Sequence, residues 1–381
     1  INNNDFLERI ALLRAAREDV YVKFWFVIDN PCKDHLSAVK KLAAELNDKQ
    51  LRHDGNYFIN VIHYGANRGA SFARNTGYNY SVADWVLFLD DDCMPEQNIL
   101  DAYCGALQRF PDAKVLAGMT ELPEAINTWT SMLRVCNVGY FYGVSKRMRH
   151  PPWAVTANLL VSGSRFNHTI QFKDCYPKTG GGEDIDFVYQ YKQFYPSIGV
   201  HVTASVPEAV VRHPWWNAGK VCYNHIRGWA WGDSMCITEW PSKTFLTFPN
   251  WVEHVVLITL PMSIYTRKPL PGLAAGGCVV LLEHLVKTAR YMPEAIKEYS
   301  GKGIFHTLLV AFGAGTVLSS QEITRVQAFI RRFSWYSICR RVDWFDGQEP
   351  RIKLDIQFGS LIRFAVNMGI TYMGFGSSLW A

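Results

Sequence analysis

The sequence lacks the cysteine patterns of disulfide-stabilised proteins and of zinc ribbons. Its 381 residues include nine cysteines, an odd number at irregular spacing, and no Cys-x-x-Cys pair occurs. Because both kinds of structure depend on characteristic cysteine spacings, neither is expected here. The cysteine usage fits a reducing compartment best.

Long runs of one charge are also missing. The 39 basic and 34 acidic residues are scattered along the chain and give a formal net charge of +5. This distribution argues against a nucleic acid polymer as a partner, but it is compatible with a mild attraction to anionic lipid headgroups. Residues 1–18 are polar and then predicted helical, without the order of residues that marks a secretory signal peptide. Hydrophobic residues make up 49% of the chain, which suffices for a folded core.

Strand-like and helix-like segments alternate through the first 213 residues. Strands are expected at 21–29, 57–64, 84–90, around 115, at 156–163 and at 199–211, and helices at 34–47, 70–82, 97–110 and from 183 onward. This rhythm predicts an α/β fold with a mostly parallel central sheet, whose ligand sites lie at the carboxyl ends of the strands. The tract 214–240 is crowded with tryptophan and glycine without a clear period, and we expect a loop-rich cap there.

Three adjacent carboxylates, Asp90, Asp91 and Asp92, end the apolar segment LFLDDD. Such groups repel one another, and folding tolerates them only if a cation or hydrogen-bond donors neutralise them. Alternate side chains of an extended chain point the same way, so Asp90 and Asp92 are expected to hold a divalent ion that bridges a diphosphate. The alternative is a solvated acidic loop that caps the following helix.

Glu183 and Asp184 follow three glycines at a predicted helix start. Acidic residues are favoured in a first helical turn in any case, but the glycines let the backbone approach a ligand and let the loop move. A carboxylate held here could take the proton from an acceptor hydroxyl as that hydroxyl attacks a sugar carbon. Direct attack from the face opposite the leaving group would invert the anomeric centre.

Four further polar residues are candidates for the site. Asp29 ends the first strand and could accept hydrogen bonds from a nucleotide base or ribose, although alone it is an ordinary turn acid. Arg68 and Arg74 lie around a glycine turn and could order the acidic loop or bind phosphate oxygens, with a solvated helix face as the alternative. His213 follows the last strand as a third metal ligand or phosphate donor, although a lone histidine is more often structural.

Three apolar runs, 251–265, 273–286 and 304–318, occupy the last third of the chain. A full membrane crossing needs about 20 apolar residues, and these runs are shorter and contain Glu253, Glu283 or several glycines. They could be interfacial helices or a crossing pair, and a buried helical bundle is the alternative. We expect residues 1–240 to form the catalytic domain and residues 241–381 a helical, membrane-associated region.

Together these motifs resemble the family 2 inverting glycosyltransferases of the GT-A fold. The motifs are VIDNPCKD, NRGASFARNTG with DWVLFLDDDCMP, TANLLVSGSRF with GGGEDIDF, and PEAVVRHPWW. The resemblance implies that Asp29 binds the base and that Asp90 and Asp92, as a DXD motif, hold the diphosphate and the metal. It also implies that Asp184 is the catalytic base, with Glu183 beside it.

The same resemblance implies a hexosyltransferase that requires Mn²⁺ or Mg²⁺. The donor would be a nucleotide-diphosphate sugar such as a UDP-sugar, with Arg68, Arg74 and Asp91 in the donor-binding set. The C-terminal apolar runs, in turn, suggest an acceptor that is a glycan or a lipid-linked hydroxyl close to a membrane, and the cysteine usage suggests a catalytic domain on the reducing, cytoplasmic side. The Gln-x-x-Arg-Trp motif of processive synthases is absent from the sequence, so transfer of a single sugar is expected.

Two departures from the family pattern leave an alternative open. The family normally begins with a Val-Ile-Pro-like strand that this sequence lacks before Ile1, so either the chain is truncated there or the sheet lacks a nucleotide-contacting strand. Tyr189-Gln190 also stands where arginine is frequent. The missing strand favours an inactive GT-A-like subunit of a larger assembly, whereas the intact acids oppose it, because a scaffold needs no mutually repelling carboxylates. A phosphatase with two acids after an apolar strand is a weaker alternative, because Cys93 follows the triplet where the flanking Thr or Val would be expected.

Overall fold

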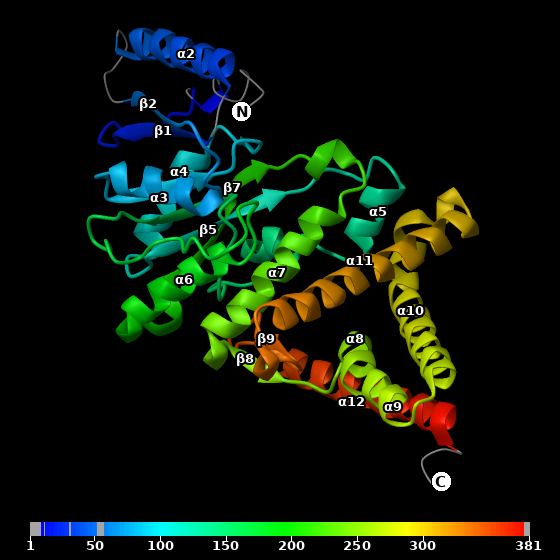
Figure 1. The fold of residues 1–381 in the computed structure, drawn as a ribbon. Coiled ribbons are helices and arrows are strands. Elements are labelled where there is room, and N and C mark those ends of the chain that lie inside the picture. Colours follow the sequence, from blue (N-terminus) through cyan, green and yellow to red (C-terminus); the bar gives the residue numbers. More distant parts are fainter. Residues whose placement is uncertain (1–8, 11, 30–31, 52–56, 377–381) are drawn as a thin grey trace. The chain divides into compact units, whose positions relative to one another are not determined.

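The computed structural model describes residues 9–10, 12–29, 32–51 and 57–376. The chain divides into two compact units. Unit 1 comprises Ile1–Glu124 and Gly139–Trp215, and unit 2 comprises Ala125–Val138 and Trp216–Ala381. Figure 1 shows the order of the elements along the chain, and each unit is considered by itself.

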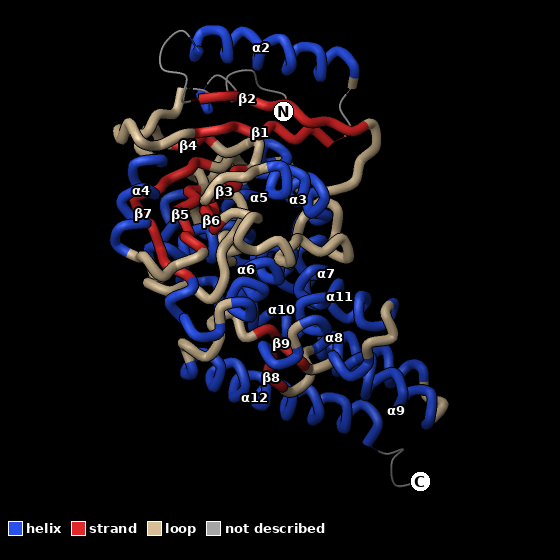
Figure 2. Tube along the Cα trace, turned by 90° about the vertical axis from the view of Figure 1, so that its left-hand side faces the viewer, coloured by secondary structure: helices blue, strands red, loops and turns tan. Residues whose placement is uncertain are grey.

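Unit 1 contains two sheets among the described residues. Strands β1 (Val22–Asp29) and β2 (Tyr57–Tyr64) pair in parallel, and helix α2 (Lys33–Leu51) runs alongside them, as Figure 2 shows. The second sheet has the strand order β3-β6-β5-β7-β4. Its strands are β3 (Trp85–Leu89), β4 (Met94–Pro95), β5 (Val115–Glu121), β6 (Asn158–Ser162) and β7 (Thr203–Arg212). All six strands expected from the sequence are present.

The pairing within the five-stranded sheet is mixed, so the expectation of a mostly parallel sheet was wrong in this detail. Only β5 and β7 pair in parallel, while β6 runs antiparallel to both β3 and β5, and β4 antiparallel to β7. Two consecutive strands can pair in parallel only if the connection between them carries the chain back to the end of the sheet where the first strand began. Residues 122–157 do not return the chain in this way. Strand β6 therefore begins at the end of the sheet where β5 finishes, and it runs antiparallel to β5.

The helices of unit 1 follow the expected order. They are α3 (Ala70–Tyr80), α4 (Ile99–Arg109) and α6 (Glu183–Phe194), with the 3₁₀ segments η1 (Tyr140–Lys146) and η2 (Pro196–Val202). Helix α4 buries Ile99, Tyr103 and Ala106, which lie on one face at helical spacing and pack toward β7. The helix predicted at the start of the chain falls largely outside the described residues. Only Arg9 and Ile10 are helical, and residues 12–20 form turns.

Buried strands in the middle of the second sheet fix the carboxyl end of β3, where the acid triplet begins. Every residue of β6 is buried, and β5 is buried up to Thr120. Leu116, Leu160 and Val206, from three neighbouring strands, belong to one hydrophobic cluster. Burying this apolar surface stabilises the sheet by roughly 25 cal/mol per Å². The acidic residues thus extend from a rigid support.

Unit 2 is mainly helical. It contains α5 (Thr128–Val135), α7 (Tyr223–Glu239), α8 (Trp251–His254), α9 (Leu260–Tyr265), α10 (Pro269–Tyr299), α11 (Ile304–Arg331) and α12 (Pro350–Phe375). Short segments η3 (Trp216–Gly219), η4 (Pro241–Lys243), η6 (Ser300–Lys302) and η7 (Trp335–Ser337) connect them, and a π-helical turn, η5 (Val255–Thr259), joins α8 to α9. Strands β8 (Thr244–Leu246) and β9 (Arg340–Val342) pair antiparallel.

The expectation of a loop-rich cap over residues 214–240 was wrong, because most of this tract is helix α7. Its Ile226, Ala230 and Met235 are buried among the other elements of unit 2. Glycines within the helix lower its intrinsic propensity, and aromatic residues on several faces hide the helical period. Packing of the buried face overrides both signals.

Two helices of unit 2, α10 and α11, have the length and the apolar composition needed to cross a membrane. The apolar run 251–265 forms the shorter helical stretch from α8 to α9. The three apolar runs seen in the sequence are therefore all helical.

Candidate active site

The acid triplet lies on a turn at the end of β3, not on an extended strand. The backbone N–H of Cys93 donates to the carbonyl oxygen of Asp90 at 3.1 Å, which closes the turn over residues 90–93. The argument that Asp90 and Asp92 point the same way by alternation was therefore wrong, because alternation holds only in an extended chain. Asp90 instead pairs with Arg74, and Asp92 lies against His213, while Asp91 lies exposed on the turn.

Arg74 on α3 joins the two groups of acids that the sequence singled out. Its Nη2 atom lies 3.0 Å from Oδ1 of Asp90, and its Nη1 atom lies 2.7 Å from Oε1 of Glu183. Burial of the Arg74 guanidinium acts to lower its pKa, but the two carboxylates outweigh burial and raise the pKa above its ordinary value. Arg74 is therefore a permanent cation that neutralises part of the cluster.

The glycine triplet places Glu183 and Asp184 at the start of α6. Gly180, Gly181 and Gly182 have φ values of 86°, 128° and 87°, a region that side chains other than glycine rarely adopt. This left-handed loop turns the N–H of Gly181 back to donate to the Glu183 carboxylate. Glu183 is 3% exposed, so its two oxygens are satisfied by an arginine and a backbone amide rather than by water.

Asp184 has a carboxyl group that is poised to hold a proton near neutral pH. It is only partly exposed, and its Oδ1 atom accepts a hydrogen bond of 2.9 Å from the backbone N–H of Ile185. Burial raises the pKa of Asp184 to about 8, the Glu183 carboxylate adds to the rise, and Arg74 opposes it. A carboxyl group with such a pKa can take up or release a proton under ordinary conditions.

Asp92 and His213 form the second half of the cluster. His213 follows β7 and is 4% exposed, and its Nε2 atom lies 3.6 Å from Oδ1 of Asp92. Burial raises the pKa of Asp92, the nearby Asp90 and Asp91 raise it further, and His213 opposes the rise. The Sγ atom of Cys93 lies 3.8 Å from the Asp92 carboxylate, so an aspartate, a cysteine and a histidine come together here.

The arrangement of His213 tests whether these residues fit a metal ion. Its Nδ1 atom lies 2.6 Å from the carbonyl oxygen of Pro214, which can only accept, so Nδ1 carries the proton. In the neutral ring, Nε2 then presents a lone pair toward the Asp92 carboxylate, an unfavourable contact unless a cation or a second proton lies between them. A metal-binding histidine commonly donates its other N–H to a carbonyl in this way. The residues present fit a divalent ion.

Asp29 lies at the carboxyl end of β1 and holds the loop that begins α3. Its Oδ1 and Oδ2 atoms accept hydrogen bonds of 2.8 Å and 2.7 Å from the backbone N–H groups of Arg68 and Gly69. Gly69 has a φ of 91°, and a Cβ atom at this position would lie 2.9 Å from Lys178. Only glycine fits where the loop passes this close to the backbone of another segment.

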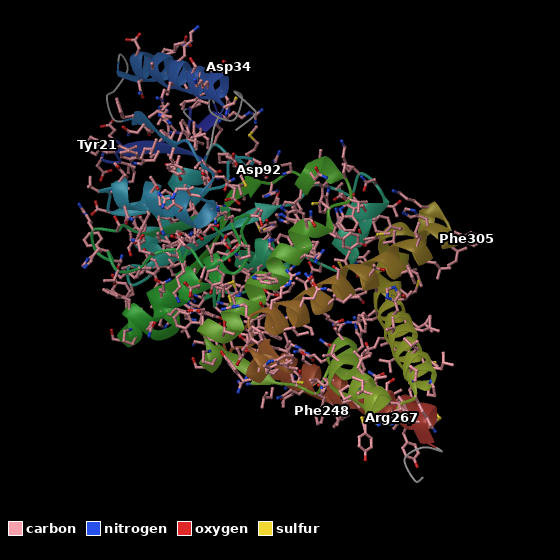
Figure 3. The ribbon with its side chains drawn as sticks, viewed as in Figure 1. Tyr21, Asp34, Asp92, Phe248, Arg267 and Phe305 are labelled. Atoms are coloured by element: carbon pink, nitrogen blue, oxygen red, sulfur yellow. The ribbon has the colours of Figure 1, made fainter. Side chains whose placement is uncertain are left out.

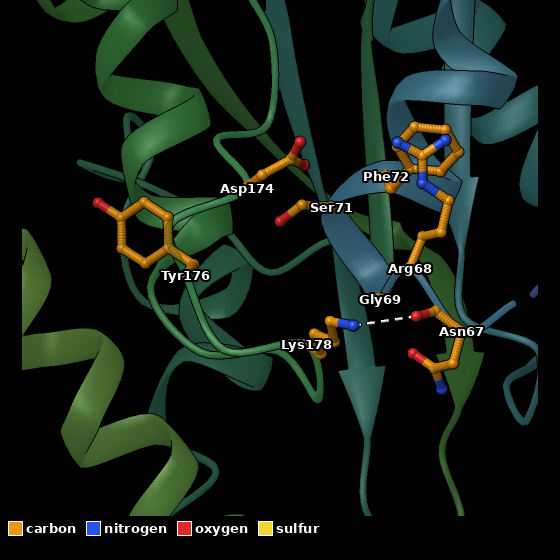
Figure 4. Close-up of a pocket in the computed structure, with 8 residues that line it drawn as sticks. All are labelled: Asn67, Arg68, Gly69, Ser71, Phe72, Asp174, Tyr176 and Lys178. Atoms are coloured by element: carbon orange, nitrogen blue, oxygen red, sulfur yellow. Dashed lines mark hydrogen bonds between the residues drawn. The ribbon is translucent and has the colours of Figure 1, made fainter.

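A pocket of about 250 Å³ opens beside this loop, at the start of α3 (Figure 4). Its lining is Asn67, Arg68, Gly69, Ser71, Phe72, Asp174, Tyr176 and Lys178. The Arg68 guanidinium lies 3.3 Å from the centre of the Phe72 ring, and Lys178 Nζ donates to the carbonyl oxygen of Asn67 at 3.0 Å. Ser71 is 6% exposed, and its hydroxyl has no hydrogen-bond partner among the described residues.

The structure thus brings most of the predicted site residues together. Arg74, Asp90, Glu183 and Asp184 form one cluster, and Asp92 with His213 adjoins it through the turn. Arg68 lies in the pocket instead, and Asp29 lies behind the same loop. Sequence reasoning missed five residues, namely Ser71, Cys93, Asp174, Tyr176 and Lys178. Cys93 and Lys178 could have been found from their positions beside the acid triplet and the glycine triplet, whereas no local signal marked the others.

A mixed α/β sheet flanked by helices, with acids clustered where strands end, places unit 1 in the GT-A-like class. Residues 10–157 match the family model described as Glycosyl transferase family 2. This match agrees with the resemblance for the segment that carries Asp29, Arg68, Arg74 and the acid triplet. No curated protein sequence matches the chain significantly.

Two solved structures are similar to this chain at low sequence identity. The mannosyltransferase PcManGT from Pyrobaculum calidifontis, in complex with GDP-Man and Mn²⁺, is 14% identical with a TM-score of 0.44, over 88% of this chain and 84% of that chain. TarS 1-349 from S. aureus is 12% identical with a TM-score of 0.37, over 87% of each chain.

Proposed function

We propose that this protein is an inverting, metal-dependent glycosyltransferase that moves a single sugar from a nucleotide-diphosphate sugar to an acceptor hydroxyl. The observation that carries the proposal is the cluster around Arg74, in which Asp90 and Glu183 come from distant segments to one guanidinium. Bringing buried carboxylates together costs free energy, which is typical of functional sites. The family match over residues 10–157 supports the same class of enzyme.

Asp184 is the proposed general base. In its ionised form it takes the proton from the acceptor hydroxyl, and the acceptor oxygen bonds to the anomeric carbon. The bond from that carbon to the diphosphate breaks, and the nucleoside diphosphate leaves with the electron pair. Attack and departure on opposite faces invert the anomeric centre. Glu183 positions Asp184 by fixing the first turn of α6 to Arg74.

Asp92 and His213 are the proposed metal ligands, with Asp90 as a third. The lone pair of His213 Nε2 that faces Asp92 supports this assignment. A bound Mn²⁺ or Mg²⁺ would supply positive charge that stabilises the departing diphosphate. The Oδ1 atom of Asp90 is already paired with Arg74, so Oδ2 would be the atom that meets the cation.

The pocket at the start of α3 is the proposed place of the nucleoside part of the donor. Arg68 and Lys178 offer positive charge, and Ser71 offers a hydroxyl that has no hydrogen-bond partner among the residues described. Asp29 would act mainly through the loop that it holds, since both of its oxygens already accept backbone hydrogen bonds. Arg74 and the exposed Asp91 would lie toward the phosphates. A UDP-sugar is the proposed donor.

The acceptor is proposed to be a glycan or lipid-linked hydroxyl close to a membrane. The apolar helices α10 and α11 support membrane association of residues 241–381, with residues 1–240 as the catalytic domain on the cytoplasmic side. The irregular cysteine spacing, which indicates no disulfide framework, supports a reducing compartment.

One observation favours a second candidate, an inactive GT-A-like binding subunit. Arg74 already neutralises Asp90 and Glu183, so part of the acid cluster is stable without a metal or a donor. Such a subunit would retain donor binding or partner binding without turnover.

The test uses the full chain and a panel of UDP- and GDP-sugars with Mn²⁺. The proposed enzyme gains thermal stability from one donor and hydrolyses or transfers it in a Mn²⁺-dependent manner. Asp184→Asn should abolish turnover while changing the donor Kd by less than about threefold, because removal of a base affects the transition state alone. Donor binding without any turnover by the wild type would identify the inactive subunit instead. Loss of donor binding in Asp184→Asn would give this residue another role.

A further inference from the structure

Helix α12 presents most of its apolar residues outward, and three of its four buried residues are polar, the fourth being Phe375. Ser360, Asn367 and Thr371 are 6%, 1% and 1% exposed, although none of them is apolar. Phe358 and Met373 on the other face are 66% and 76% exposed. A helix at the surface of a water-soluble protein shows the opposite arrangement, with its apolar stripe against the core. The outer face of α12 is therefore better suited to an apolar environment than to water.

A similar arrangement occurs in α10, which packs against α12, and in α11, which packs against α10. In α10 the buried residues include Glu283 and Lys287, whereas Leu270 and Leu273 are more than 70% exposed. In α11 the buried positions are mostly small or polar, and Phe305 is 85% exposed. Figure 3 shows the Phe305 side chain projecting away from its helix.

The inward charges are paired between helices. Glu283 of α10 lies 3.7 Å from Arg363 of α12, and Lys287 of α10 pairs with Glu322 of α11 and donates to Ser319 at 3.1 Å. Ionisable residues of membrane-embedded helices face the bundle interior and pair in this way, since lipid cannot solvate them.

Close contacts between the helices depend on small residues. A Cβ atom at Gly374 of α12 would lie 3.0 Å from Ala275 of α10. A Cβ atom at Gly315 of α11 would lie 3.2 Å from Lys287 of α10. Small residues at helix contacts are typical of membrane bundles, where association depends on close packing rather than on burial from water.

Charge is distributed along α12 as a bilayer requires. Between Ile356 and Phe375 the only charged residue is Arg363, which is the one paired with Glu283. Arg351 and Lys353 precede this stretch at the start of the helix, and Arg267 and Lys268 precede α10. Cations at the ends of apolar stretches meet anionic headgroups favourably. Arg267 is exposed, as Figure 3 shows.

We propose that lipid acyl chains cover the exposed faces of α10, α11 and α12, and that α12 is a third lipid-facing helix. Average hydropathy does not single out α12, because Asn367, Thr371 and the other inward polar residues lower the mean. The stretch from Ile356 to Phe375 is about 30 Å long as a helix, which matches the thickness of a hydrocarbon core. This inference deepens the membrane part of the proposed function and rests on it.

Cysteine labelling in vesicles tests the proposal with a native probe. Cys278 is exposed on α10, and Cys32 and Cys175 are exposed in unit 1. An Ala365→Cys variant adds a thiol at an exposed position of α12. The full chain is reconstituted in phosphatidylcholine vesicles with and without phosphatidylserine and treated with a water-soluble maleimide. Each cysteine peptide is then quantified by mass spectrometry.

The proposal expects the thiols on α10 and α12 to react at least tenfold more slowly than Cys32, and all thiols to react alike after denaturation in SDS. Labelling of Cys278 or of the Ala365→Cys thiol at the rate of Cys32 would overturn it. Efficient cross-linking of Cys278 between chains at high lipid dilution would also overturn it, because a second copy would then cover the face.

A charge variant gives an independent readout. Phe358→Lys with Ile362→Lys should reduce flotation with vesicles at least tenfold, whereas Phe194→Lys with Val200→Lys, at exposed apolar positions of unit 1, should not. Equal flotation of both variants contradicts the inference. Neither readout depends on turnover, so a failure of the glycosyl-transfer proposal would be seen separately in the donor assays.

Discussion

The Nη1 atom of Arg74 lies 2.7 Å from Oε1 of Glu183, a residue 109 positions further along the chain. The same guanidinium reaches Asp90, so one side chain fixes helix α3 to the end of β3 and to the first turn of α6. The side chain of Glu183 is 4% exposed and that of Arg74 is 17% exposed. An ion pair this deeply buried is costly to break from one side, since the remaining charge loses both its partner and its water.

Replacement of Arg74 is expected to destabilise unit 1. Arg74→Gln leaves Glu183 buried without a counter-charge, and the expected cost is about 3–5 kcal/mol in the free energy of unfolding at pH 7. Denaturant unfolding followed by circular dichroism measures it. Arg68→Gln is the control, because the exposed guanidinium of Arg68 mainly covers the Phe72 ring, a contact of about 0.5–1 kcal/mol. Equal stability of the two variants would show that Arg74 does not hold the cluster together.

The pH dependence of turnover should reveal Asp184. A general base works only when deprotonated, and the pKa of Asp184 is raised to about 8. Activity is therefore low below this pKa and rises as the pH increases through it. The profile of kcat/KM reports groups of the free enzyme, so its rising limb should have an apparent pKa near 8 rather than near 4. A flat profile between about pH 6 and pH 9 would argue against Asp184 as the base.

The raised pKa of Asp184 also predicts how the stability of the protein changes with pH. The pKa of Asp184 rises from 3.8 to about 8 on folding, so the folded state binds more protons between these values. The stability of the wild type consequently falls as the pH rises through this window. Asp184→Asn removes the penalty and should be more stable at pH 7 by on the order of 2 kcal/mol, after allowance for partial exposure. Below the lower pKa the two proteins should converge, and a gain that is constant with pH would contradict the assignment.

Binding of Mn²⁺ should depend on the pair of Asp92 and His213. Asp92→Asn and His213→Gln are each expected to weaken Mn²⁺ binding by at least about tenfold, since each removes a ligand. Electron paramagnetic resonance of free Mn²⁺ measures the affinity without reference to activity. Glu96→Gln is a matched control, because Glu96 is a nearby acid that pairs with Arg212 on the surface. Unchanged affinity in both ligand variants would exclude this site.

Local patterns in the sequence were sufficient to predict the strands and the acids but not their partners. An apolar strand that ends in three aspartates marks the site because both features lie within one short segment. The alternation argument for Asp90 and Asp92 failed because residues 90–93 form a turn. The hydrogen bond that closes this turn could not be predicted from the local sequence. Arg74 was a candidate from its motif, yet its pairing with Glu183 required a contact across 109 positions. No periodicity encodes such a contact.

The helices of unit 2 also show that local sequence patterns do not predict which residues will be buried. Average hydropathy identified the runs that became α10 and α11, because the average counts residues without regard to the face they occupy. In α12 the polar residues Ser360, Asn367 and Thr371 lower that average, and only their burial shows that the outer face is apolar. Helix α7 was missed for a related reason, because its buried residues follow no clean period. In α7 and α12, the packing partners determine which face is buried, and the sequence of the segment alone does not.

Ser71 gives the sharpest test of the pocket, because its hydroxyl is buried and has no hydrogen-bond partner in the part of the chain that the structure describes. Ser71→Ala loses no hydrogen bond in the free state, so the free energy of unfolding should stay equal or increase by up to about 1 kcal/mol. If the donor nucleoside satisfies this hydroxyl, the variant should raise the donor KM about fivefold to tenfold with kcat unchanged, which is the signature of uniform binding. Lys146→Met, in a surface ion pair with Glu121, serves as a control that should change neither quantity. An unchanged KM would place the donor elsewhere, and a loss of stability would mean that the hydroxyl already has a partner in the folded protein.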